Sequence, residues 1–172
     1  MSPSGTEPSN LTTGRPQRAV SLDARDMSDV RPLSALHVLE FNYTRSLGPT
    51  LAAFFEGLAA RKIVGAKTAS GRVLVPPTPH DPDTGEDVAG LVDLPDTGVV
   101  TTWAWVHKPR PRHPLQKPFA WALVQIDGAD TAMLHVVDAG DESKMSTGMK
   151  VRARWADDAT GSILDLTCFE PA

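Results

Sequence analysis

The densest set of side chains that could do chemistry lies between residues 107 and 117. The segment reads HKPRPRHPLQK, with four full positive charges on Lys108, Arg110, Arg112 and Lys117 and no acidic residue. Arginine grips phosphate oxygens through paired N–H donors, and the prolines hold the backbone open. Two ligand classes fit: a phosphate-bearing cofactor such as coenzyme A, or single-stranded nucleic acid. A solvated loop without a ligand is the third interpretation.

Candidates for covalent catalysis are weak. Ser143, Ser146 and Ser162 lack the Gly-x-Ser-x-Gly context of a nucleophile elbow. The single cysteine, Cys168, lies in the apolar run 164–169, where an inert buried thiol is more typical than a thiolate nucleophile. One cysteine also excludes an intramolecular disulfide and a cysteine-rich zinc site. The sequence therefore favours a non-catalytic protein.

Length and composition restrict the class of protein further. The 172 residues are 41% hydrophobic, enough to fill a core, which excludes a wholly disordered chain. A net charge of −4 argues against binding nucleic acid through bulk charge. Neither a signal peptide nor a stretch of about 20 apolar residues is visible, so we expect a cytoplasmic protein without membrane association.

The sequence of the N-terminal third predicts a tail followed by one helix. Residues 1–32 are polar and proline-containing and are expected to be disordered. Residues 33–62 form a second segment, in which Pro49 suits a first helical turn. Large apolar residues at i, i+3, i+4 and i+7 then form one stripe, which packs on the core or docks on another subunit. The stripe consists of Leu51, Phe54, Phe55 and Leu58.

The remainder predicts a mainly β protein. Residues 63–95 contain two short turns, around Gly71 and Gly85, and form a small β module. Residues 96–172 contain five strand-like runs, and the economical fold for five such strands is the OB barrel. The basic loop joins the first two strands, a position that OB folds use for binding. The five runs are 99–106, 119–126, 131–137, 149–155 and 163–169.

This order of elements resembles the zinc-ribbon OB-fold proteins of domain-of-unknown-function family 35. The likeness covers about residues 43–171 and is carried by strings such as FFEGL at 54–58, GRVLVPP at 71–77, FNYTRSLGP at 41–49 and PFAWAL at 118–123. The implied fold is an N-terminal helix, a small rubredoxin-like ribbon and a five-stranded OB barrel.

The ribbon departs from the family pattern at its metal site. Aligned with Cys-Pro-x-Cys-Gly knuckles, the four cysteine positions fall on Lys67, Ser70, Asp81 and Thr84. Structural zinc needs four ligands, usually thiolate or imidazole. We therefore expect a ribbon remnant without metal and no cofactor of the chain's own.

The family resemblance also implies a function. Its members are usually small subunits that pair with thiolase-fold or hydratase-like enzymes. The implied role is a non-catalytic accessory subunit of an acyl-CoA-processing thiolase or steroid side-chain aldolase in lipid or steroid degradation. The apolar stripe would dock on the thiolase-fold subunit, and the basic loop would contact the phosphates of a shared acyl-CoA. The alternative is an OB-fold protein that binds single-stranded nucleic acid through the four cations.

Overall fold

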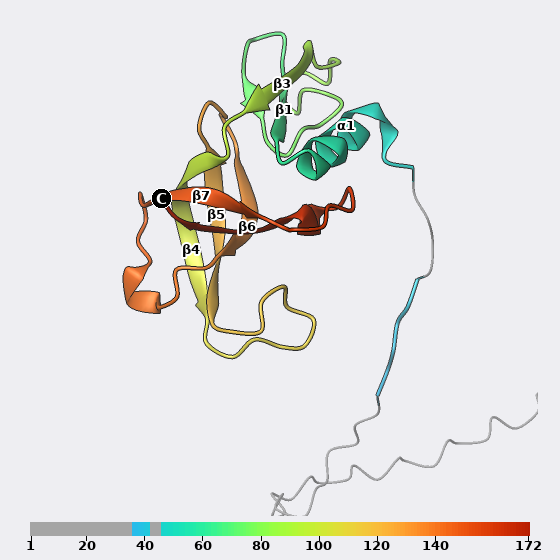
Figure 1. Ribbon diagram of the computed structural model, residues 1–172. Helices are drawn as coiled ribbons and strands as arrows, with labels where there is room; N and C mark the ends of the chain where they lie inside the picture. Colours follow the sequence, from blue (N-terminus) through green and yellow to red (C-terminus); the bar gives the residue numbers. More distant parts are fainter. Residues whose placement is uncertain (1–35, 42–45) are drawn as a thin grey trace, which may run out of the picture. The chain divides into compact units, whose positions relative to one another are not determined.

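The computed structural model describes residues 36–41 and 46–172. The predicted disordered tail, 1–32, lies outside the described residues. The chain divides into two units, Met1–Tyr43 and Thr44–Ala172, and in the first of them residues 36–41 form neither helix nor strand. Among the described residues no helix is long and apolar enough to span a membrane. All the helices and strands found among the described residues lie in the second unit, which is shown in Figure 1.

The predicted helix is α1, Gly48–Ala59, with a proline in its first turn. It ends where Arg61 takes a left-handed conformation, φ 58°, and the Lys62 N–H donates to the Gly57 carbonyl at 2.9 Å. A side chain at Gly57 would lie 2.6 Å from Val64 Cγ2, so the absence of one lets the helix lie directly on the next strand.

A three-stranded antiparallel sheet follows the helix. Its order is β2-β1-β3, with β1 at Ile63–Lys67, β2 at Val73–Leu74 and β3 at Gly90–Leu94. The sequence analysis predicted a small β module over residues 63–95, and the sheet confirms its β character, but a strand over 90–94 was not predicted. The missed strand, GLVDL, has no fully buried residue, and only Val92 and Leu94 are half-buried, so it lacks the clear apolar-polar alternation that predicts a strand.

The C-terminal part is a closed five-stranded barrel of order β4-β5-β6-β8-β7, which confirms the predicted OB fold. All pairs are antiparallel except β6 with β8, which is parallel. Its strands are β4 (Thr97–Val106), β5 (Phe119–Ile126), β6 (Ala132–Val137), β7 (Lys150–Trp155) and β8 (Leu166–Pro171).

Helix, small sheet and barrel share one apolar core. Phe54 and Leu58 of α1 are buried with Ile63 of β1 and with inward-facing barrel residues such as Val124 and Phe169. Burial of such side chains is the main favourable term in folding. The small sheet therefore does not have to be stable alone, because its apolar residues contribute to the core of the barrel.

Two short 3₁₀ helices interrupt the barrel, η2 at Glu142–Lys144 and η3 at Ile163–Asp165. The second corrects the prediction of a strand over 163–169, since β8 begins only at Leu166. Asp165 is buried and accepts N–H groups from Thr160, Gly161 and Ser162 at 2.8–3.2 Å. These bonds, with the Thr160 backbone N–H first, lower the pKa of the Asp165 carboxyl, and they bend the chain where apolar residues alone suggested a strand.

Gly98 is required by the close approach of β4 and β5. A methyl group there would lie 2.5 Å from the Gln125 carbonyl oxygen, a backbone atom that cannot move without disturbing the strand pairing. We expect Gly98→Ala to lower the free energy of unfolding by about 1–3 kcal/mol, measured by urea denaturation. Gly90→Ala is the matched control, because no heavy atom lies within 4 Å of a methyl group on that β3 glycine. Equal effects of the two substitutions would contradict the packing argument.

Candidate functional site

The basic loop, residues 107–117, connects β4 to β5 and extends from one end of the barrel (Figure 1). The His113 N–H donates to the Arg110 carbonyl at 2.9 Å, and the Arg110 N–H donates to His113 Nδ1 at 3.2 Å. The His113 ring meets Phe119 edge-on, with centroids 5.6 Å apart. Leu115 packs against a second apolar cluster that includes buried Val136. These apolar and backbone contacts hold the backbone of the loop that carries the cations.

Asp138, at the end of β6, binds one of the four predicted phosphate ligands. The Lys117 ammonium lies 2.8 Å from Asp138 Oδ2, and Arg154 Nη1 lies 3.0 Å from the same oxygen. Burial opposes ionisation of Asp138, but the hydrogen bonds from Lys117 and Arg154 outweigh it and lower the pKa of the carboxyl. Lys117 therefore anchors the end of the loop.

The other three predicted phosphate ligands remain exposed. Lys108, Arg110 and Arg112 form no ion pair with any residue in the described part of the chain. Their side chains are exposed, so their charges are available to an anion in solution. The loop thus offers three cations to a ligand where the sequence suggested four.

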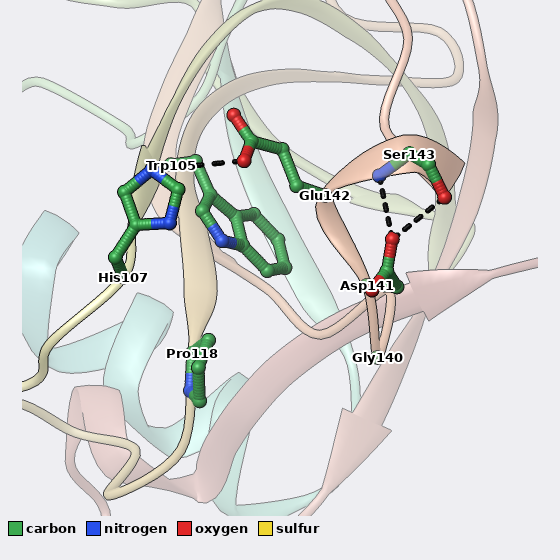
Figure 2. Close-up of a pocket in the computed structure, with 7 residues that line it drawn as sticks. All are labelled: Trp105, His107, Pro118, Gly140, Asp141, Glu142 and Ser143. Carbon is green, nitrogen blue, oxygen red and sulfur yellow. Dashed lines mark hydrogen bonds and ion pairs between the residues drawn. The ribbon is translucent and has the colours of Figure 1, made fainter.

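A pocket of about 570 Å³ lies where the loop leaves and rejoins the barrel. Figure 2 shows Trp105 and His107 on one side, with Asp141, Glu142 and Ser143 facing them. His107 Nε2 and Glu142 Oε2 are 3.6 Å apart. Hydrogen bonds from the Ser143 hydroxyl and backbone N–H lower the pKa of Asp141. Two carboxylates make this pocket unsuitable for phosphate, so a phosphate ligand would bind on the exposed part of the loop.

A second, mainly apolar groove of about 300 Å³ lies beside Arg112 on the outer face of the barrel. The sequence analysis does not predict this groove, because the residues that line it come from four separate segments of the chain. Two of these residues, Ile163 and Leu164, were also expected to lie in a strand. The available signal was the outward-facing pair Leu123 and Leu134, which are opposite each other on β5 and β6 and exposed. The lining residues include Arg112, Pro114, Trp121, Leu134, His135, Ile163 and Leu164.

His135 forms part of that groove and is 8% exposed. Its Nε2 lies 2.7 Å from the Leu166 carbonyl oxygen. A carbonyl only accepts, so Nε2 must donate. Burial lowers the pKa of His135, although the bond to Leu166 partly opposes that effect. The imidazole is thus held neutral, with its proton on Nε2 and a lone pair on Nδ1.

The predicted docking stripe on α1 is divided between the core and the surface. Phe54 is 2% exposed and Leu58 is fully buried in the chain's own core. These two side chains therefore follow the core-packing interpretation and cannot contact another protein. Leu51 and Phe55 are half-buried and remain the only members of the stripe that a partner could reach.

The first ribbon turn is closed by a side-chain oxygen. Thr68 is 1% exposed, and its Oγ1 accepts the Arg72 N–H at 3.1 Å and contacts Ser70 Oγ at 2.9 Å. Gly71 has φ 91°, as the turn requires. Lys67 and Ser70, at the first two cysteine positions, provide no thiolate or imidazole.

The second turn has the same design around Asp81, which is 5% exposed. Its Oδ1 accepts the Asp83 N–H at 2.9 Å, and Thr84 Oγ1 accepts the Glu86 N–H at 3.2 Å. An ion pair between Arg72 and Asp83 joins the two turns. The side-chain oxygens Asp81 Oδ1 and Thr84 Oγ1 thus already accept hydrogen bonds within the turn.

The donor set does not fit structural zinc. Within 36–41 and 46–172 no group of three or more His, Cys, Asp or Glu could hold a metal ion, and Lys67, Ser70 and Thr84 are poor zinc ligands. The predicted absence of zinc remains a prediction.

Neither Cys168 nor the two tryptophans of β4 adds a chemical function. Cys168 is fully buried, and burial raises the pKa of its thiol to about 11, so a thiolate nucleophile is disfavoured at neutral pH. Trp103 and Trp105 are half-buried against the barrel core. Trp105 also lines the pocket that contains Asp141 and Glu142, whose carboxylates disfavour the phosphate backbone of a nucleic acid.

Comparisons with known proteins agree with this architecture. The model of the ChsH2 C-terminal OB-fold domain matches residues 91–156. A solved structure named Ltp2-ChsH2(DUF35) aldolase is similar with a TM-score of 0.55 and 25% identity over 74% of this chain and 98% of the matched chain. A DUF35 protein of unknown function from Sulfolobus solfataricus has a TM-score of 0.52 and 22% identity over 62% of this chain and 77% of its own. No curated protein matches.

The lowered pKa of His135 predicts a pH dependence of stability. Below pH 6.5 the unfolded histidine takes up a proton before the folded one does, so stability falls as the pH decreases through and below 6.5. Urea denaturation between about pH 7.5 and about pH 5 should show this fall, and His135→Gln should reduce its slope. An NMR titration of the folded imidazole at or above 6.5 would contradict the assignment.

Proposed function

We propose that this chain, whose residues 91–156 match the ChsH2 C-terminal OB-fold domain, is a non-catalytic accessory subunit of a thiolase-superfamily enzyme. The enzyme would be of the thiolase or steroid side-chain aldolase type and would act on acyl-CoA in lipid or steroid degradation. The observation that carries the proposal is the likeness to the Ltp2-ChsH2(DUF35) aldolase, which extends over 98% of the matched chain. In that structure a DUF35 protein is named together with an aldolase subunit.

The basic loop is proposed to contribute to binding of CoA. Coenzyme A carries a 3′-phosphate and a pyrophosphate, and the free cations Lys108, Arg110 and Arg112 match such a target. Lys117 is not assigned to this role, because it is paired with Asp138. Pro109 and Pro111, on either side of Arg110, restrict the backbone of the loop.

The reaction itself is assigned to the partner enzyme. The one thiol in the chain is buried, and in the part of the chain that the structure describes no serine pairs with a histidine. The thiolase-fold subunit would supply the nucleophile, and Leu51 and Phe55 of α1 would contribute contacts to it.

Co-expression tests the partnership directly. The chain is produced with a tagged thiolase-fold protein from the same genome, and the purified material is examined by light scattering and metal analysis. We expect a stable complex with this chain and no stoichiometric zinc. A chain that stays alone with every such protein would contradict the accessory role, whereas a complex with stoichiometric zinc would contradict only the metal-free ribbon.

The double substitution Arg110→Ala with Arg112→Ala tests the loop within that complex. We expect KM for acyl-CoA to rise about tenfold, since two charge-assisted contacts to phosphate are lost, while kcat and the fold stay the same. Steady-state kinetics at low and high salt give the readout, because screening weakens exposed charges.

A charge-matched control is available in Lys67→Ala with Lys150→Ala. Both lysines are exposed, lie outside the loop and form no ion pair with the described residues. An equal rise of KM in both double variants would show a general charge effect, and no change in either would remove the loop from CoA binding.

A further inference from the structure

The apolar groove on the outer face of β5 and β6 has exposed walls. Leu134 is 62% exposed and Leu164 is 67% exposed, and Trp121 lies beside them. Contiguous exposed apolar residues of this kind mark binding sites. The volume of about 300 Å³ is at the lower end of the range for small-molecule pockets, which are mostly apolar with a few placed polar groups.

The floor of the groove has an unused hydrogen-bond acceptor. His135 is more than nine-tenths buried and lines the groove. Its Nε2–H is committed to the Leu166 carbonyl, and its Nδ1 has no hydrogen-bond partner among the described residues. No side-chain nitrogen or oxygen of the described residues is both fully buried and unpaired, so Nδ1 retains accessible surface, and the groove is a cavity that His135 lines. A ligand that enters can donate a hydrogen bond there.

The rim of the groove has a cation. Arg112 lines it, whereas Arg110, two residues earlier in the same loop, does not. The Arg112 guanidinium forms no ion pair with any described residue, and guanidinium pairs best with a carboxylate or phosphate. Because Arg112 lies at the rim, the charged end of a ligand would lie at the mouth of the groove.

We propose that this groove binds a small amphipathic organic anion that carries a hydroxyl group. The apolar body lies against Trp121, Leu134 and Leu164, the hydroxyl donates to His135 Nδ1, and the carboxylate pairs with Arg112. This site goes beyond the accessory role and does not depend on a partner enzyme. A small molecule fits better than a protein segment because the acceptor lies at the floor, where only a group that enters the groove reaches it.

A series of ligands tests the proposal on the unmodified full-length chain. The probes are 3-hydroxydecanoate, decanoate and 1-decanol, titrated by isothermal calorimetry at neutral pH. We expect 3-hydroxydecanoate to bind with a Kd of about 1 mM or tighter, as ligand efficiencies allow for its size. Decanoate should bind about two- to tenfold more weakly because it lacks the donor, and 1-decanol more weakly still.

Two loop variants give the matched control for the carboxylate. Arg112→Ala should weaken binding of 3-hydroxydecanoate about tenfold, because a charge-assisted pair is lost. Arg110→Ala removes the same charge from the same loop but leaves the groove intact, so it should bind like the unmodified chain. Circular dichroism checks that both variants are folded.

Several results would overturn the proposal. Equal affinity for decanoate and 3-hydroxydecanoate would remove His135 from recognition, and equal losses in the two arginine variants would show non-specific attraction. If no probe binds saturably while Leu134→Asp abolishes association with a thiolase-fold protein, the groove is a protein interface instead. That result would leave the accessory role standing, so the two proposals fail separately.

Discussion

The buried carboxylate of Asp138 is the electrostatic centre on which the arrangement of the candidate site depends. It joins the end of the basic loop, through Lys117, to β7, through Arg154, and its backbone N–H donates to the Phe169 carbonyl of β8 at 2.8 Å. The Asp138 carboxylate is only 5% exposed, and a buried charge is tolerated only when it is paired and hydrogen-bonded. Loss of Lys117 or Arg154 would therefore leave this buried charge without a full set of partners. By taking Lys117 into this network, Asp138 determines which loop cations remain for a ligand.

The loop separates two surfaces of opposite character. At its base lie the carboxylates of Asp141 and Glu142, which repel anions. Along its outer side lies an apolar groove with Arg112 at the rim. An anionic ligand is therefore directed to the outer side, and its apolar part finds the groove there. The carboxylates of Asp141 and Glu142 and the guanidinium of Arg112 thus favour an anionic ligand on the outer side, and the groove favours a ligand with an apolar part.

The sequence predicted most of the fold because the barrel strands have a strong signal. Residues 119–126 were assigned with the observed bounds, and the helix stripe of Phe54 and Leu58 followed its period into the core. β3 is hard to recognise because it has no fully buried residue and only Val92 and Leu94 are half-buried. The 3₁₀ turn at Ile163 is predicted as strand because the apolar residues of this run outweigh the local capping box that Ser162 and Asp165 form. The same limit applies to the site: charge runs are visible in a sequence, whereas the pairing of Lys117 with Asp138 and the groove beside Trp121 arise only when distant segments meet.

The two ribbon turns close on the oxygens of Thr68 and Asp81 and are linked by Arg72 and Asp83. Residues 63–95 contain no cysteine, so peroxide or a thiol-modifying agent has no sulfur to attack in this module. A ribbon held by thiolates would lose its shape when they are oxidised. The module of residues 63–95 has no thiolate to lose, so it should keep its connection between helix and barrel under oxidative conditions. The single thiol of the chain, Cys168, is buried inside the barrel.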